Sequence, residues 1–278
     1  MKAVVTTTSV YPPCTDQTEV LRRLHGIGYT GLDLAFDYCV QETDYPFMTD
    51  AYEDWARSLR AQADALGVRY SHGHAPFDAS GRGDIVERTL RCAELLGIRY
   101  LVVHPIWRDA DGNILHDREE FLSVNTQAIL PLLPEAARHG VVLLSENLLW
   151  GASVDAENIS ALVSRVDSPW FGWCYDTGHA KALGRTPDAL YGCIPPLSLH
   201  IQDNHGRTDG LYDDHLIPGD GKIDWKRLMD ILRETRYPGD VVLEAHHQPL
   251  EAKDEAARQA ILAELLVRAQ KLRTYLEH

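Results

Sequence analysis

Nine side chains of the kinds that bind metal ions lie along this chain, and most of them directly follow short aliphatic segments. They are His74, His104, Glu146, Asp176, His179, His200, Asp213, His215 and Glu244. A repeated pattern of this kind indicates that the ends of several strands converge. The carboxyl ends of the strands converge at the active-site face of a parallel barrel. Imidazole and carboxylate ligands without paired cysteines favour a catalytic divalent metal such as Zn²⁺ or Mn²⁺.

Four of these residues form the best candidate for a single metal site. Glu146, Asp176 and Glu244 end aliphatic segments in a carboxylate, and His200 lies within another such segment. Burying a carboxylate costs on the order of several kcal/mol unless a cation pairs with it. This oxygen-rich set suits Mn²⁺, Mg²⁺ or Co²⁺ as well as Zn²⁺. For the glutamates, the alternative is an ion pair with arginine or lysine.

The segment from Asp176 to His179 is the strongest local pattern, because an apolar strand runs directly into it. We expect Gly178 to let the chain turn, so that His179 returns over Asp176. The alternative is that Asp176 caps a helix and His179 lies on the surface.

A second group adds ligands for further ions or for a substrate. Asp213 and His215 are two residues apart, so in an extended segment their side chains point to one side. His74 and His104 end strands, although a hydrogen-bonded structural role is also open for each.

Aromatic and basic residues near the same strand ends are candidates to contact a substrate. Trp107 and Trp150 follow His104 and Glu146 and suit stacking on the apolar face of a sugar; core packing explains each alone equally well. Arg207 follows His200 and suits a substrate oxyanion or hydroxyl, but a solvated surface position fits it too.

Eight strand-like segments separated by helical patterns must position these residues. The strands are Ala3–Thr8, Gly31–Phe36, Arg69–His74, Tyr100–His104, Val141–Glu146, Phe171–Asp176, Leu197–Ile201 and Val241–Ala245. The helices are Thr18–Ile27, Ala51–Leu66, Asp84–Leu96, Glu119–His139, Asp155–Val166, Thr186–Cys193, Trp225–Thr235 and Lys253–Leu276. Most strands are continuous apolar runs, which is typical of strands buried on both faces.

Strict alternation of strand and helix predicts parallel strands with right-handed crossovers. We therefore predict an α/β fold, a single-domain (β/α)8 TIM barrel spanning residues 1–278. The length is close to the ~250 residues typical of such a barrel. Longer segments at 37–50 and 203–224 fall on the predicted active-site face. In the second of these, residues 218–221 (Pro-Gly-Asp-Gly) predict a turn.

The composition of the chain indicates which classes of partner and which cellular compartment to expect. A net charge of −14 argues against nucleic acid, which needs a basic footprint. Five widely spaced cysteines without a C-x-x-C motif predict reduced thiols. The first residues lack the apolar stretch of a signal peptide, and no apolar run reaches the ~20 residues of a membrane span. We expect a cytoplasmic protein with no membrane partner; a homo-oligomer stays open.

These segments resemble the xylose isomerase-like superfamily of metal-dependent barrels, which includes sugar isomerases, keto-sugar 3-epimerases, dehydroshikimate dehydratases and endonuclease IV. The resemblance covers nearly the whole chain, and the loop running from Asp213-x-His215 into Pro-Gly-x-Gly-x-Ile-Asp-Trp is among its specific parts. It implies one divalent metal held by the four residues Glu146, Asp176, His200 and Glu244. It also implies that the two glutamates handle substrate protons and that His179 and Arg207 contact the sugar.

The resemblance has one departure and one ambiguity. The 3-epimerases carry another glutamate where this chain has Ala152, six residues after Glu146, so we expect different substrate recognition. The residues that match the multi-zinc set of endonuclease IV are His74, His104, His179, Asp213 and His215. Relatives that are not nucleases keep those residues too.

The favoured function is a metal-dependent isomerase or epimerase acting on a small sugar or keto-sugar. A cation stabilises the enediolate formed when a proton leaves the carbon next to a carbonyl, and Glu146 and Glu244 would move that proton. One alternative is a sugar lyase or dehydratase with the same enolate chemistry. The other is an endonuclease IV-like multi-zinc phosphodiesterase, although segment 206–214 carries one arginine against three aspartates.

Overall fold

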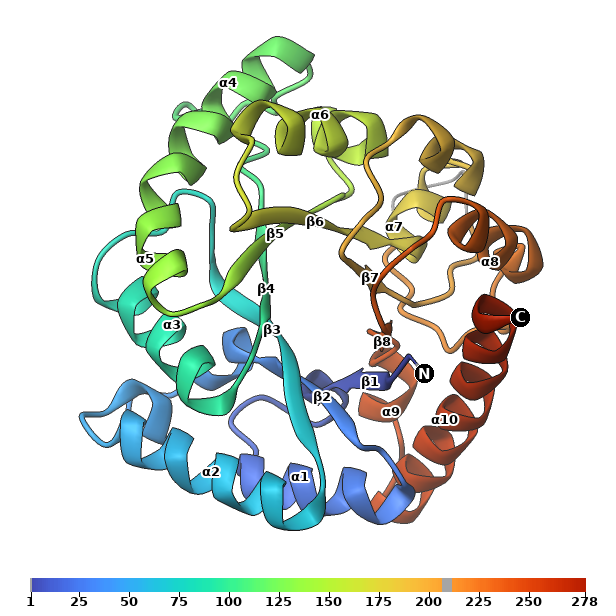
Figure 1. Cartoon of the computed structure of the whole chain (residues 1–278). Helices are drawn as coiled ribbons and strands as arrows, with labels where there is room; N and C mark the ends of the chain where they lie inside the picture. The colour runs from blue at the N-terminus through green and yellow to red at the C-terminus, as the bar shows by residue number, and fades with distance from the viewer. Residues whose placement is uncertain (1, 207–211) are drawn as a thin grey trace.

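Eight parallel strands form the inner ring of the molecule, and helices surround them (Figure 1). The computed structural model describes residues 2–206 and 212–278. The strands are β1 Val4–Thr7, β2 Gly31–Ala35, β3 Arg69–Asp78, β4 Tyr100–His104, β5 Val142–Glu146, β6 Phe171–Asp176, β7 Ser198–His200 and β8 Val241–Leu243. Their order is β7-β6-β5-β4-β3-β2-β1-β8.

The barrel is nearly closed between its two shortest strands. Ile201, just after β7, bridges to Leu243 of β8 in parallel register. Its backbone nitrogen donates to Val242 O at 2.8 Å, and its carbonyl accepts from Glu244 N at 3.0 Å. The predicted (β/α)8 TIM barrel is therefore confirmed. This closure also holds Glu244 directly against the end of β7.

Ten helices occur in the described part of the chain. They are α1 Gln17–Ile27, α2 Tyr52–Leu66, α3 Asp84–Leu96, α4 Arg118–Ile129, α5 Leu133–Arg138, α6 Ala156–Val166, α7 Thr177–Ala182, α8 Trp225–Glu234, α9 His247–Leu250 and α10 Glu255–Glu277. The 3₁₀ segments are η1 Thr8–Val10, η2 Phe36–Val40, η3 Pro46–Met48, η4 Leu130–Leu132, η5 Gly151–Val154 and η6 Pro187–Gly192. Gly67 and Gly97 end α2 and α3 with left-handed φ values of 69° and 80°, as the sequence indicates.

Three sequence predictions of helices need correction. The expected helix 119–139 is broken into α4, η4 and α5, because Pro131 and Pro134 lack the backbone donor that a continuous helix needs. The expected helix 186–193 is the 3₁₀ segment η6, which begins at Pro187. The short helices α7 and α9 were not predicted, since neither has room for an amphipathic repeat.

The long segment after β7 is organised around one buried carboxylate, Asp203. It accepts hydrogen bonds from Asn204 N (2.8 Å), Gly219 N (2.8 Å), Ile223 N (3.1 Å) and Trp225 Nε1 (2.9 Å). The predicted turn at 218–221 thus wraps Asp203. The Asp203 backbone also pairs in antiparallel fashion with Leu216, the neighbour of His215.

Packing separates an outer core from the barrel interior. The large apolar cluster contains side chains of both strands and helices, for example Trp173 of β6 and Leu162 of α6. A small cluster of Val102, Val142, Leu144 and Cys174 lies in the interior. Cys174 is one of five free cysteines, three of them buried, which agrees with the expected reduced thiols. No helix in the described ranges is long and apolar enough to cross a membrane.

Candidate metal centre

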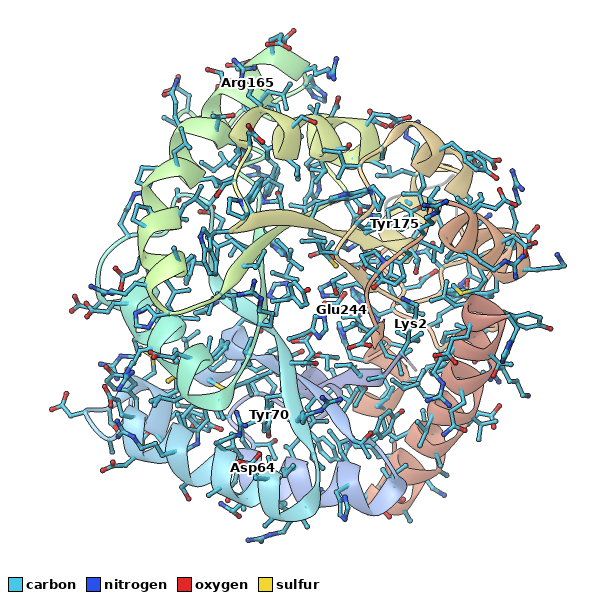
Figure 2. The ribbon with its side chains drawn as sticks, in the orientation of Figure 1. Lys2, Asp64, Tyr70, Arg165, Tyr175 and Glu244 are labelled. Carbon is cyan, nitrogen blue, oxygen red and sulfur yellow. The ribbon has the colours of Figure 1, made fainter. Side chains whose placement is uncertain are left out.

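Seven of the nine predicted ligands line a cavity of about 230 Å³ at the carboxyl ends of the strands; Asp176 and His200 do not line it but lie next to Glu146 and Glu244, which do. Figure 2 labels Glu244 inside the ring of strands. The cavity is lined by Thr7, Ser9, Ala35, Asp37, Tyr38, His74, His104, Glu146, Leu148, Trp150, His179, Asp213, His215, Glu244 and His246. A larger cavity of about 680 Å³ lies by the start of α6 and the end of α7, and no predicted ligand lines it.

The central cluster consists of Glu146, Asp176, His200 and Glu244, with one ligand atom of each within 4.8 Å of the others. Nδ1 of His200 lies 2.8 Å from Glu146 Oε1 and 3.2 Å from Glu244 Oε2. Ligand atoms about 2.1 Å from a cation lie about 3.0–3.4 Å apart in octahedral or tetrahedral geometry. These separations therefore fit a single ion.

A second cluster shares Glu146 with the first. Nε2 of His74 and Nε2 of His104 are 3.1 Å apart, and Glu146 Oε2 lies 3.8 Å and 3.3 Å from them. Glu146 thus turns one oxygen toward His200 and the other toward the two histidines. The third, outer cluster consists of His179, Asp213 and His215.

Hydrogen bonds fix which ring nitrogen of each outer histidine faces the cavity. Nδ1 of His179 donates to Asn147 O at 2.9 Å, and Nδ1 of His215 donates to Glu244 O at 2.8 Å. Nε2 of each ring therefore faces the cavity. Asp213 Oδ2 lies 3.3 Å from Nε2 of His179 and 2.9 Å from Nε2 of His215. A histidine ligand is normally oriented in this way by a partner of its other nitrogen.

The start of α7 brings the central and outer clusters together. Asp176 caps this helix, and its Oδ1 accepts from His179 N at 2.6 Å. Asp176 is thus a cap, but His179 is buried rather than on the surface. The expected turn at Gly178 is wrong, since Gly178 lies inside α7; its Cβ would lie 2.0 Å from Gln202 Oε1.

The carboxylates of the central cluster are compensated by imidazoles. Burial by itself raises the pKa of Glu146 and of Glu244, but the surrounding histidines, His200 foremost, together outweigh it and hold both pKa values below their usual range. Burial raises the pKa of Asp176 to about 7. Among the described residues, no arginine or lysine forms an ion pair with these carboxylates, so the expected alternative of such pairs does not occur there.

Neighbouring acids keep two of the histidines protonated in the metal-free protein. Burial lowers the pKa of His74, but the nearby carboxylates of Glu146, Asp37 and Glu244 together outweigh it and raise that pKa to about 9. Burial likewise opposes protonation of His215, but the Asp213 hydrogen bond and the charges of Glu244 and Asp176 together raise its pKa to about 9.

The donor set fits a divalent cation. The buried Glu146 Oε2 accepts no hydrogen bond from any residue that the structure describes, yet two imidazole nitrogens face it. Nε2 of His74 and Nε2 of His104 lie 3.1 Å from each other, and Glu146 Oε2 lies beside them. Three ligand atoms that converge in this way have the arrangement of metal ligands.

The predicted substrate contacts are only partly in the described structure. Trp150 lines the cavity, while Trp107 stacks on Trp150 with ring centroids 4.4 Å apart. Arg108 lies over Trp107, 4.0 Å from the centroid of one of its rings. Arg207 lies outside the described residues.

Several residues of the site were not predicted from the sequence. Asn147 bonds both backbone polar groups of Asp176, at 2.8 and 3.0 Å. Gln202 contacts the carboxylates of two clusters. Asp33 is buried in β2, its pKa is raised by burial to about 6, and its Oδ2 is 3.8 Å from His200 Nε2. A polar side chain within an apolar strand, as at Asp33, was the available signal.

The fold and this arrangement of ligands agree with a family model described as the xylose isomerase-like TIM barrel, which matches residues 21–264. The chain belongs to this family. Nothing about its reaction follows from that membership alone, because one fold hosts many functions.

Two relatives are similar in sequence. Uncharacterized protein y4fM of Sinorhizobium fredii is 30% identical over 213 residues, which cover 71% of this chain and 55% of that protein. Inosose dehydratase of Lacticaseibacillus casei is 25% identical over 181 residues, which cover 56% of this chain and 60% of that enzyme. The alignments thus span less than two thirds of either relative.

Two solved structures share the fold over nearly their whole lengths. The 3-keto-D-glucoside 4-epimerase YcjR from E. coli superposes with a TM-score of 0.72 and 18% identity, covering 98% of this chain and 100% of YcjR. The IOLI protein with a bound zinc atom superposes with a TM-score of 0.76 and 17% identity, covering 99% and 98%.

Proposed function

We propose that this chain is a metal-dependent isomerase or epimerase of a small sugar or keto-sugar. The observation that carries the proposal is the central cluster of three carboxylates and a histidine at the mouth of the barrel. Its cavity of about 230 Å³ lies below the ~300–1,000 Å³ usual for drug-sized ligands, so it suits one small molecule. A fold shared with a keto-glucoside epimerase and sequence similarity to inosose dehydratase support a sugar substrate.

The chemistry assigned to the chain is proton transfer next to a carbonyl. A divalent cation bound by the central cluster would supply the positive charge that stabilises an enediolate. Glu146 and Glu244 have pKa values below their usual range, so both are ionised at neutral pH and able to accept a proton. His179 and Trp150 would orient the sugar, and Leu148 adds an apolar side chain to the cavity wall.

The same residues would serve an elimination. Once a carboxylate has taken the proton from the carbon next to the carbonyl, it can return that proton to the hydroxyl on the adjoining carbon, which leaves as water. The reaction is then a dehydration instead of an epimerisation. The similarity to inosose dehydratase supports this variant. Product analysis distinguishes the two, because only elimination lowers the product mass by one water.

A second candidate function, a multi-metal phosphodiesterase, is favoured by the three clusters around one cavity. In addition to the central ion, we propose that His74 with His104 and the outer cluster can hold further ions. Two or more ions would clamp the attacking and leaving oxygens of a phosphodiester. The net charge of −14 disfavours a polynucleotide as the substrate.

The proposal is tested by loading the metal-free protein with Mn²⁺, Co²⁺, Zn²⁺ or Mg²⁺ and assaying a panel of ketoses, keto-glycosides and cyclic polyol ketones. We expect turnover of at least one sugar that disappears on chelation and returns with metal. Hydrolysis of a phosphodiester without turnover of any sugar would instead select the second candidate.

A further inference from the structure

One buried amide connects the central and outer clusters. Nε2 of Gln202 donates to Asp176 Oδ1 at 3.2 Å and to Asp213 Oδ1 at 3.2 Å. An amide nitrogen carries two hydrogens, so these two carboxylates use both of them. Gln202 is fully buried, and Asp176 and Asp213 belong to different clusters.

The orientation of this amide follows from its surroundings. With the amide reversed, Oε1 would face two carboxylates and repel them. In the present orientation the buried Oε1 accepts no hydrogen bond from the residues that the structure describes. An unsatisfied buried acceptor costs about 1–3 kcal/mol. The amide is thus held between the two clusters although one of its own polar atoms is left unsatisfied.

The backbone around Gln202 leaves room for this position only because residue 178 is glycine. A Cβ at Gly178 would lie 2.0 Å from Gln202 Oε1 and 2.6 Å from its Nε2. Thr177 Oγ1 donates to Gln202 O at 2.7 Å, which fixes the Gln202 backbone against the start of α7. These contacts place the amide directly against the start of α7, beside Asp176.

We propose that Gln202 is a positioning residue that couples the two clusters, so that an ion in the central cluster raises the affinity of the outer cluster for a second ion. An ion that orders Asp176 also orders the Gln202 amide, and the amide holds Asp213 ready with its Oδ2 toward His179 and His215. The inference rests on the metal binding in the proposed function, and it adds a linkage between sites.

The test measures the stepwise binding of Zn²⁺ to the metal-free protein by calorimetry in the presence of a competing chelator. The variant Gln202→Met keeps the length and volume of the side chain and removes the amide. We expect the second dissociation constant to rise about 10- to 100-fold, the usual effect of losing a partner of a ligand, and the first to rise less.

Gln248→Met is the matched control. Gln248 also holds the segment after β7, because it accepts from Ile217 N at 2.7 Å and donates to Asp220 Oδ2 at 2.9 Å, and neither of these partners is a ligand of either cluster. We expect this variant to bind both ions as the wild-type protein does. Gln202→Asn, which keeps an amide that is too short to reach both carboxylates, replaces Gln202→Met if the latter does not fold.

Three outcomes would overturn the coupling: a wild-type protein that binds two ions independently, one that binds fewer than two ions, or equal losses in the Gln202 and Gln248 variants. The coupling and the proposed function fail separately. Independent binding with sugar turnover intact overturns the coupling alone. Cooperative binding without sugar turnover leaves the coupling standing and overturns the function.

Discussion

Glu146 is the residue on which the site depends most, because it offers one oxygen to each of two clusters. Its Oε1 is 2.8 Å from His200, and its Oε2 is 3.3 Å from His104. Only 1% of the Glu146 surface is exposed, so water does not stabilise its charge. The cation proposed to bind between these groups would explain why an acid occupies this position.

Replacing Glu146 by Gln should therefore remove activity without unfolding the chain. The amide keeps the shape of the side chain, but it cannot take a proton, and turnover should drop about 10²- to 10⁴-fold. Steady-state kinetics and circular dichroism measure the two effects. Glu87→Gln, at an exposed position on α3, is the control and should keep full activity. Equal activity of wild-type and Glu146→Gln protein would exclude this residue as the base.

The raised histidine pKa values give the metal-free protein a defined pH dependence. His74 and His215 have pKa values of about 9, above the ~6.5 of an unfolded histidine. Their contribution to stability is complete below about pH 6.5 and is lost as the pH rises through about 9. Thermal unfolding of chelator-treated protein should thus show a falling Tm over this interval.

Added metal should have the opposite pH dependence. An ion binds the unprotonated imidazole, so the increase in Tm on adding Zn²⁺ should grow as the pH rises from 6.5 to 9. The double variant His74→Gln, His215→Gln should flatten both curves. A metal-free protein whose Tm rises over this interval would show that the two histidines are not held protonated by their acids.

At the scale of the elements, the carboxyl ends of the strands could be predicted and the short segments after them could not. Glu146 ends a continuous apolar run, and that pattern alone gives its strand and its place. Helix α7 has only six residues, too few for a periodic pattern, so the sequence predicts a turn at Gly178 where the structure has a helix. Gln202 gave no signal, because its role depends on two carboxylates that the fold brings to it.

Gly178→Ala tests the close approach between α7 and the end of β7. Alanine favours a helix, but the added Cβ would collide with the Gln202 amide. Overpacking of this kind costs about 1–3 kcal/mol. Gly26→Ala in α1 meets nothing within 4 Å, and should instead stabilise the chain by about 0.5–1 kcal/mol. Urea unfolding of both variants measures the contrast, and equal stabilisation by both would contradict it.

Asp203→Asn tests how the segment after β7 is held. The new amide nitrogen would face donors such as Gly219 N and Trp225 Nε1, at a cost of about 1.5–3 kcal/mol for each lost charged hydrogen bond. Unfolding should need less urea, and the outer cluster should lose affinity for metal. Asp220→Asn in the same segment removes a partly exposed ion pair with Arg268, worth about 0–1 kcal/mol. Equal effects of both variants would argue against Asp203 as the organising group.

At the scale of the whole molecule, the sequence was sufficient to predict an eight-stranded parallel barrel, because strand-like segments, most of them continuous apolar runs, alternate with helical patterns along the whole chain. It was not sufficient for substrate contacts. Trp107 stacks on Trp150, and this pairing joins the segments after β4 and β5, which are more than forty residues apart in the chain. The compartment and the oligomeric state stay predictions.

Incubation with a keto-sugar in D₂O tests the central claim most directly. We expect the metal-loaded protein to place deuterium on the carbon next to the carbonyl of at least one single-ring sugar, and mass spectrometry or NMR detects it. Chelation or Glu146→Gln should abolish the exchange, whether the reaction ends in epimerisation or in elimination. A fully metal-loaded protein that exchanges no carbon-bound hydrogen in any ketose, keto-glycoside or cyclic polyol ketone would contradict proton transfer as the chemistry of this site.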